Sequence, residues 1–169
     1  MNSGAVNIRR AARGDEDSIL GLIGELAEYE RLAHEVTATP ALLAEHLFGD
    51  NAVAEALLAE IDGAAVGFAL FFRNFSTFLG RPGLYLEDLY VREACRGRGI
   101  GRALLKRLAD LARERGYGRM EWSVLNWNQP AIEFYQSLGA EAMSDWTVYR
   151  LSRDGQVPEL PPPAGPKYR

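Results

Sequence analysis

Three closely spaced segments decide the fold of this chain: Tyr85-Leu-Glu-Asp-Leu-Tyr-Val91, Arg96-Gly-Arg-Gly-Ile-Gly101 and Arg102-Ala-Leu-Leu-Lys-Arg-Leu-Ala-Asp-Leu111. Aromatic and branched residues in the first segment predict a strand. Apolar residues at three- and four-residue steps in the last segment predict a helix. The glycines between them let several backbone N–H groups converge at the helix N-terminus, where the helix dipole is positive. We therefore predict a strand, a glycine loop suited to phosphate oxygens, and a helix.

Two other glycine motifs are alternatives for the same loop. A P-loop would need lysine and serine or threonine after its last glycine, whereas arginine and alanine follow Gly101. A dinucleotide fingerprint is favoured by Glu121, which lies about 20 residues past the glycines, where a ribose-binding acid is expected. It is disfavoured by the Gly-x-Gly-x-Gly spacing, by the mid-chain position and by two acids, Glu87 and Asp88, in the preceding strand.

Composition indicates one globular domain. The chain has 169 residues, 47% of them hydrophobic, which is enough for a sizeable core. Cys95 is the single cysteine and has no partner for an internal disulfide, and no apolar run is long enough to span a bilayer, so we expect a cytoplasmic protein. The net charge of −4 disfavours nucleic acid as a partner. His34 and His46 lack a second ligand at metal spacing, so no metal is predicted.

The remaining elements follow from periodicity and from turn residues. Helices are predicted after Asp15, with the apolar stripe Ile19, Leu22, Ile23 and Leu26, and after the cap Thr39 with Pro40 in the first turn. A hairpin is predicted for residues 53–61 and 65–72 around Asp62-Gly63. Further predictions are a first strand over 6–11, a loop over 74–83, a strand over 119–125, a helix over 131–138 and a last strand over 147–151.

The loop and its surroundings resemble a known family. Arg96 to Gly101 match the Arg/Gln-x-x-Gly-x-Gly/Ala loop of the GNAT superfamily of N-acetyltransferases, which cradles the pyrophosphate of acetyl-CoA. Together with Tyr85 to Val91, the segment Asn126-Trp-Asn-Gln-Pro-Ala-Ile-Glu-Phe-Tyr-Gln-Ser-Leu-Gly-Ala140 resembles the spermidine/spermine (diamine) acetyltransferase branch. The resemblance runs from about Asn7 to Leu151 and is densest over residues 84–140.

The resemblance implies a single GNAT-like domain over residues 1–152, of the α/β (α+β) class, followed by a proline-rich tail over 153–169. The expected sheet is central, mixed and mostly antiparallel, with about six or seven strands splayed between the fourth and fifth, and is flanked by about four helices. The resembling branch forms homodimers, so a homodimer is expected here as well.

Acetyl transfer to an amine needs a neutral amine, a polarised thioester carbonyl and a proton for the departing thiolate. A primary amine with a pKa near 10.4 is almost wholly protonated at neutral pH, so a carboxylate should accept its proton. Glu87 and Asp88 must point to opposite faces of their strand unless a bulge intervenes. By resemblance, Glu87 contacts the amine and acts as a water-mediated base, Asp88 supports it, and Tyr135 is the general acid.

The resemblance also implies two sets of binding residues. Unpaired backbone N–H groups of the fourth strand would polarise the carbonyl and bind the pantetheine. The residues expected to bind acetyl-CoA are Leu89, Tyr90, Val91, Arg96, Gly97, Arg98, Gly99, Ile100, Gly101, Arg102, Asn128, Gln129, Pro130, Ala131 and Tyr135. The residues expected on the amine side are Tyr29, Glu30, Glu87, Asp88, Glu121, Trp122 and Ser123.

Two departures leave the substrate open. Position 121 is glutamate where the animal polyamine enzymes have histidine, and their paired glutamates before the last strand are reduced to Asp145-Trp146. The expected function is acetyl transfer from acetyl-CoA to a primary amine of a small cationic substrate, such as a polyamine, a diamine or a lysine- or thialysine-like amino acid. The alternatives are a protein-lysine acetyltransferase and a non-enzymatic acyl-CoA-binding sensor on the same fold.

Overall fold

The computed structural model describes residues 4–153 and 155–160. By its internal contacts the chain divides into two compact units, one up to Ser123 and one from Val124 onward, and each is described by itself. The first unit contains β1 (Val6–Arg10), α1 (Glu16–Tyr29), η1 (Ala33–Glu35), α2 (Pro40–Phe48), β2 (Glu55–Ile61), β3 (Ala64–Ser76), β4 (Arg81–Val91), η2 (Glu93–Cys95), α3 (Ile100–Glu114) and β5 (Met120–Trp122). The second contains α4 (Gln129–Ser137).

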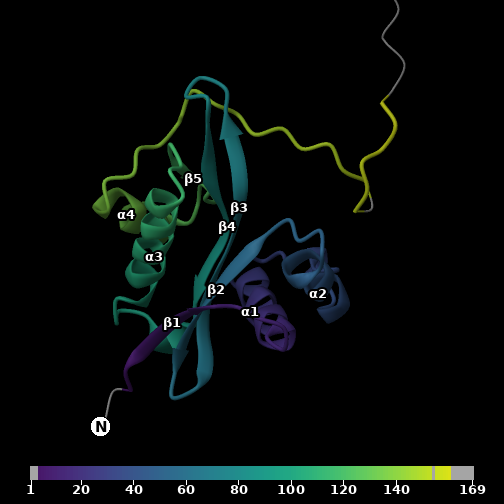
Figure 1. Ribbon diagram of the computed structural model, residues 1–169. Helices are drawn as coiled ribbons and strands as arrows, with labels where there is room; N and C mark the ends of the chain where they lie inside the picture. The colour runs from purple at the N-terminus through teal and green to yellow at the C-terminus, as the bar shows by residue number, and fades with distance from the viewer. Residues whose placement is uncertain (1–3, 154, 161–169) are drawn as a thin grey trace, which may run out of the picture. The chain divides into compact units, whose positions relative to one another are not determined.

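The first unit is a sheet covered by helices on both faces. Its strands lie in the order β1-β2-β3-β4-β5, with antiparallel pairing except for the parallel pair β4–β5. Helices α1 and α2 cover one face and α3 covers the other (Figure 1). This arrangement confirms the predicted fold class. No helix in the described part of the chain is long and apolar enough to cross a membrane.

Local sequence signals explain most of these elements. The Thr39 hydroxyl accepts a hydrogen bond from the Leu42 N–H at 3.2 Å, and Pro40 opens α2, as predicted. The β2–β3 turn has positive φ at both Asp62 and Gly63, which is the geometry that two-residue hairpin turns favour. Ile19, Leu22 and Leu26 are buried along α1, so its predicted apolar stripe is confirmed.

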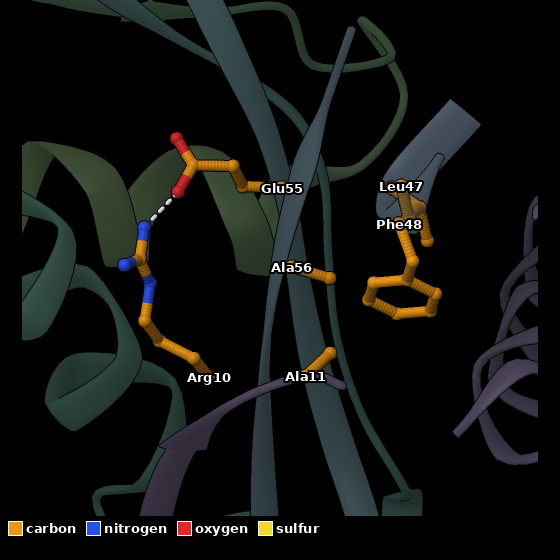
Figure 2. Close-up of a pocket in the computed structure, with 6 residues that line it drawn as sticks. All are labelled: Arg10, Ala11, Leu47, Phe48, Glu55 and Ala56. Atoms are coloured by element: carbon orange, nitrogen blue, oxygen red, sulfur yellow. Dashed lines mark hydrogen bonds and ion pairs between the residues drawn. The ribbon is translucent and has the colours of Figure 1, made fainter. Parts of the chain in front are cut away.

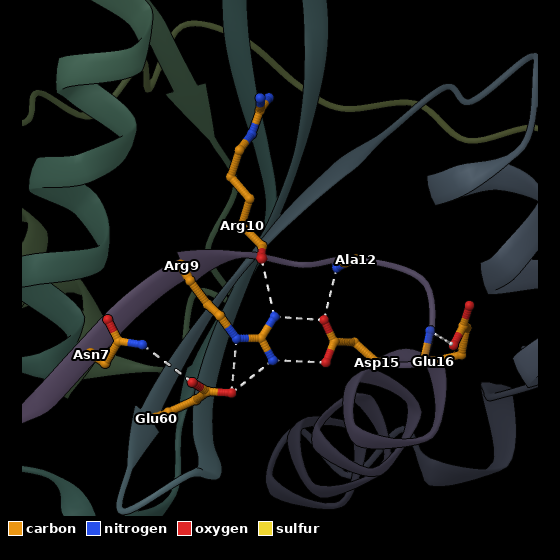
Figure 3. Close-up of polar contacts among 8 residues, drawn as sticks. Asn7, Arg9, Arg10, Ala12, Asp15, Glu16 and Glu60 are labelled. Carbon is orange, nitrogen blue, oxygen red and sulfur yellow. Dashed lines mark hydrogen bonds and ion pairs between the residues drawn. The ribbon is translucent and has the colours of Figure 1, made fainter.

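The N-terminus of α1 is held to the sheet by one arginine. Arg9 of β1 donates two hydrogen bonds to the Asp15 carboxylate, at 2.7 and 2.8 Å, and its Nε donates to Glu60 of β2 at 2.9 Å (Figure 3). Asp15 also accepts from the Ala12 N–H at 2.8 Å. The hydrogen bonds from Arg9 lower the pKa values of both carboxylates. Arg9 therefore joins two strands and a helix start through charged hydrogen bonds.

Replacing Arg9 tests this junction. We expect Arg9→Gln to lower the free energy of unfolding at pH 7 by about 1 to 2 kcal/mol. The substitution removes the positive charge beside two mostly buried carboxylates, those of Asp15 and Glu60. The partial exposure of Arg9 to solvent limits the size of the effect. Carboxylates with lowered pKa values stabilise the fold above their unfolded-state pKa values, near 4, and this contribution is lost as the pH falls further. The difference between Arg9→Gln and wild type should therefore shrink in urea titrations below pH 4. Exposed Arg13→Gln, which removes a hydrogen bond to the backbone carbonyl of Phe48, should show no such trend.

Several predicted boundaries were wrong. β3 extends to Ser76 and β4 begins at Arg81, so the loop predicted over 74–83 is a short turn at the end of a long hairpin. β5 is three residues long, whereas 119–125 was predicted. No strand forms over 147–151, where Val148 and Tyr149 are 78% and 92% exposed. The described residues therefore form five strands, fewer than the six or seven expected. The proline-rich tail lies largely outside the described residues.

Candidate active site

A β-bulge interrupts β4 at its two acidic residues, Glu87 and Asp88. In the β3–β4 register Leu70 opposes Asp88 and Phe71 opposes Leu86, so Glu87 is the extra residue. Phe68 and Tyr90 belong to the core under α1, and alternation along β4 puts Asp88 on that same face. Without the bulge, Leu86 would share this face as well. The bulge therefore lets β4 bury leucines toward α3 and then present a carboxylate toward α1.

Three carboxylates gather where α1 ends beside β4. Asp88 is partly buried, and its pKa is raised from 3.8 to about 6, first by burial and then by the charges of Glu87 and Glu30. Burial also raises the pKa of Glu30, which follows the last residue of α1. The Glu87 side chain is exposed to solvent. This group, which we call the acidic cluster, can bind a cation and accept a proton near neutral pH.

Beyond the bulge, one edge of β4 pairs with no strand in the described part of the chain. The pairing with β5 covers only Leu84 to Leu86 and ends there. The Arg92 N–H donates to the Val66 carbonyl on β3 at 2.9 Å, so by alternation the N–H groups of Val91 and Leu89 point to the opposite edge. The same alternation directs the Tyr90 N–H toward β3. Among the three predicted backbone donors, Leu89 and Val91 therefore face an edge to which an extended ligand can add.

β3 and β4 approach each other closely at Gly67. A Cβ atom built on Gly67 would lie 2.7 Å from the Tyr90 carbonyl oxygen and 3.2 Å from a Val91 methyl group. Both strands would have to shift to admit it. The sequence reading missed this residue, because a glycine within a strand shows its role only once the opposing backbone is known.

We expect Gly67→Ala to destabilise the protein by about 1 to 3 kcal/mol, as overpacking usually does, measured by urea unfolding. Gly21 of α1 is a matched control, because a Cβ there meets nothing within 4 Å and its φ is not positive. Gly21→Ala should leave stability unchanged or raise it by up to about 1 kcal/mol. Equal effects of the two substitutions would refute the role of the close strand approach.

The glycine loop takes the predicted form. Gly97 and Gly99 have φ values of +73° and +78°, and a Cβ at either would meet nothing within 4 Å, so glycine serves the backbone conformation there. Gly99 begins α3 without a side-chain cap, which leaves the first N–H groups of the helix available to an anion. The side chains of Arg98 and Arg102 are exposed beside the loop, and Arg98 contacts the Gly4 carbonyl at 3.3 Å. These features fit a pyrophosphate.

Arg96, the first residue of the loop, is turned toward the protein. Its Nε donates to the Val91 carbonyl at 3.0 Å. Its guanidinium carbon lies 4.8 Å from the centre of the Tyr29 ring and 5.7 Å from that of Tyr90. The loop is thereby connected both to the open edge of β4 and to the end of α1.

Glu121 is engaged in contacts of its own. Its carboxylate accepts hydrogen bonds from Arg119 at 2.8 Å and from Asn74 at 3.0 Å. Trp122 is partly buried next to it, and the hydroxyl of Ser123 lies 2.9 Å from that of Tyr85. Glu121 opposes Tyr85 in the sheet, before the bulge, whereas Asp88 lies after it. The structure thus brings Glu30, Glu87 and Asp88 together and gives the Glu121 carboxylate two partners of its own.

The second unit carries the remaining predicted residues. Asn128 is buried, and its side-chain oxygen accepts from the Ala131 N–H at 3.4 Å, so it caps α4 ahead of Pro130. The helix spans Gln129–Ser137 and ends before Gly139, whose φ is +83°. Tyr135 is partly buried, with its ring centre 5.4 Å from that of Phe134. The local structure expected around Tyr135 is therefore present.

A pocket of about 250 Å³ lies elsewhere in the first unit, lined by Arg10, Ala11, Leu47, Phe48, Glu55 and Ala56 (Figure 2). It contains none of the predicted site residues. Arg10 pairs with Glu55, and Arg115 donates two more hydrogen bonds to Glu55, at 2.6 and 2.8 Å. Because its carboxylate is already neutralised, this pocket does not offer the chemistry of the acidic cluster.

Sequence reasoning also missed the ion pair between Glu25 of α1 and Arg92. Arg92 donates from Nε and Nη2 to Glu25 at 3.0 and 2.8 Å. The two residues are 67 positions apart, and both were unremarkable as surface charges. Their only sequence signal is that Glu25 lies four residues before Tyr29, on the same face of α1.

Comparison with known proteins identifies the family. Residues 21–140 match the acetyltransferase (GNAT) family. Thialysine N-epsilon-acetyltransferase from Bos taurus is 38% identical, over 86% of this chain and 92% of its own length. Spermidine/spermine N(1)-acetyltransferase-like protein 1 from Homo sapiens is also 38% identical, over 87% of this chain and 22% of its own. An integron cassette protein from V. cholerae shares the fold with a TM-score of 0.74 and 28% identity, over 89% of this chain and 94% of its own. With its glycine loop, its open β4 edge and these relatives, the chain belongs to the acetyltransferase (GNAT) family.

Proposed function

We propose that this protein transfers the acetyl group of acetyl-CoA directly to a primary amine of a small cationic substrate, a polyamine, a diamine or a lysine- or thialysine-like amino acid. The observation that carries the proposal is the acidic cluster of Glu30, Glu87 and Asp88. Glu87 and Asp88 immediately precede the open edge of β4, and the glycine loop follows that strand. Relatives named for thialysine and for spermidine/spermine support an amine acceptor of this kind.

The three carboxylates have different roles toward the amine. Exposed Glu87 and the end of α1 at Glu30 attract the positive charge, while partly buried Asp88 accepts the proton, directly or through water. The resemblance alone gave the base role to Glu87. A pKa of about 6 suits Asp88 better, because a general base works best when its pKa lies near the working pH.

The thioester supplies the electrophile. Asp88 first takes one proton from the ammonium group, which leaves a neutral amine. The amine nitrogen then forms a bond to the carbonyl carbon, the carbon–sulfur bond breaks, and the thiolate receives a proton from Tyr135. The second proton that the nitrogen loses returns through water to the Tyr135 oxygen. The N–H groups of Leu89 and Val91 face the edge where the carbonyl oxygen would lie, and one such donor is worth about 2.7 to 4 kcal/mol. The loop from Arg96 to Arg102 would hold the pyrophosphate, and Asn128 to Ala131 would contact the rest of the coenzyme.

A homodimer is part of the proposal. Thr147 to Leu151 reads as a strand, yet in the described chain it pairs with no other strand and exposes Val148 and Tyr149. Such a segment from one copy can pair with a strand edge of another. Analytical ultracentrifugation should therefore give twice the monomer mass.

Product analysis separates the enzyme from an acyl-CoA sensor. Mass spectrometry after incubation with acetyl-CoA and each amine should find the N-acetylated amine and free coenzyme A in equal amounts. A sensor would bind coenzyme A tightly and leave every amine unmodified. A protein-lysine acetyltransferase would modify a lysine peptide and leave the free amines unchanged.

A further inference from the structure

The ring of Tyr29 contacts the guanidinium of Arg96, the first residue of the glycine loop. Tyr29 is the last residue of α1, 36% exposed, and its ring centre lies 4.8 Å from the guanidinium carbon of Arg96. A guanidinium within about 6 Å of an aromatic ring centre is attracted by the ring. The resemblance placed Tyr29 on the amine side, whereas these contacts connect it to the residue that begins the predicted phosphate site.

Arg96 is exposed to solvent, yet its guanidinium has three neighbours in the protein. Tyr29 lies nearest, the Tyr90 ring lies 5.7 Å away, and the Val91 carbonyl accepts from Nε at 3.0 Å. By the register of β4, that carbonyl points to the open edge. The hydrogen bond uses Nε only, so the two terminal nitrogens of the guanidinium remain free to donate to a phosphate.

The end of α1 that carries Tyr29 is itself anchored. Glu25 lies one turn earlier on the same helix face and holds Arg92, the first residue after β4, at 2.8 and 3.0 Å. The path from α1 to the loop therefore runs through Glu25–Arg92 and Tyr29–Arg96. Both contacts lie within the first unit.

We propose that Tyr29 is a positioning residue for coenzyme binding, because its ring holds the Arg96 guanidinium at the open edge of β4 in the orientation that meets the pyrophosphate. This inference rests on the proposed function, since it assumes that the loop binds coenzyme A. It assigns Tyr29 to the donor side of the reaction.

Calorimetric titration with coenzyme A tests the assignment. Tyr29→Ala should weaken binding by about five- to ten-fold, the range expected for losing one partly exposed cation–π contact. Tyr29→Phe keeps the ring and should stay within two-fold of wild type. Tyr29→Leu keeps apolar bulk without the ring and should behave like Tyr29→Ala, which separates the ring from packing if the alanine variant folds poorly.

A double-mutant cycle shows whether Tyr29 acts through Arg96. Arg96→Ala should weaken binding further than Tyr29→Ala does, and adding Tyr29→Ala to it should cost less than two-fold more. With saturating acetyl-CoA, the KM for the amine should be unchanged in Tyr29→Ala. The kcat/KM for S-acetylpantetheine, which lacks the pyrophosphate, should also be unchanged.

Three results would overturn the inference: coenzyme A affinity within two-fold of wild type in Tyr29→Ala, a full additive loss in the double variant, or a raised amine KM with unaltered coenzyme affinity. In each of these cases the wild-type protein still binds coenzyme A and acetylates an amine, so the proposed function survives. Failure of the wild-type protein to bind coenzyme A would instead overturn both.

Discussion

Asp88→Asn is expected to lower kcat/KM for the amine by about 100-fold at pH 7, at the low end of what a general base contributes. Wild-type kcat/KM should rise with pH through about 6, the pKa of Asp88 in the free protein. Asparagine cannot accept a proton, so this limb of the pH profile should disappear. Steady-state rates from pH 5 to 8 check both expectations, and a limb near pH 6 that persists in Asp88→Asn would contradict the assignment.

The same substitution should make the protein more stable. Because the pKa of Asp88 is raised from 3.8 to about 6 in the folded state, the folded protein holds this proton more tightly than the unfolded chain does. Stability is therefore lost as the pH rises from about 4 to about 6. Asparagine stays neutral, so the free energy of unfolding at pH 7 should rise by about 1 to 2 kcal/mol. Exposed Glu87→Gln is the matched comparison: it removes only the repulsion between Glu87 and Asp88, so its gain should be smaller than that of Asp88→Asn.

Tyr135→Phe is expected to lower kcat by at least ten-fold, because the departing thiolate loses its proton donor. Coenzyme A affinity should stay within two-fold of wild type, since the ring and its packing against Phe134 are retained. Coenzyme release at saturating donor and amine measures the first quantity, and calorimetry measures the second.

Tyr117→Phe is the control for loss of a tyrosine hydroxyl. Tyr117 lies after α3, beside Arg115 at the far end of that helix from the glycine loop, and its replacement should leave kcat unchanged. A Tyr135→Phe variant that kept more than half of the wild-type kcat would exclude Tyr135 as the general acid.

Much of the first unit could be predicted from the sequence because its signals are local. The cap at Thr39, the Asp62-Gly63 turn, and the glycines at 97 and 99 each act through their own backbone or their nearest neighbours. The apolar stripe of α1 is likewise set by helical periodicity. Local signals of this kind do not depend on knowing which strands lie side by side.

The features that the sequence left open or did not indicate depend on pairing between distant segments. The bulge at Glu87 exists only relative to Phe71 and Leu70, and it decides which face carries Asp88. The close approach at Gly67 requires the carbonyl of Tyr90. The segment 147–151 has a strand-like sequence but pairs with no strand of the described chain, so strand propensity alone gave the wrong prediction there.

The most direct test of the proposed function is coenzyme A release from acetyl-CoA with spermidine, putrescine, lysine, thialysine and a lysine peptide, each run with wild type, Asp88→Asn and Tyr135→Phe. We predict rapid release with at least one small cationic amine, and large losses in both variants with that same amine. Release that required no amine, or that was equal in all three proteins, would contradict acetyl transfer at the acidic cluster.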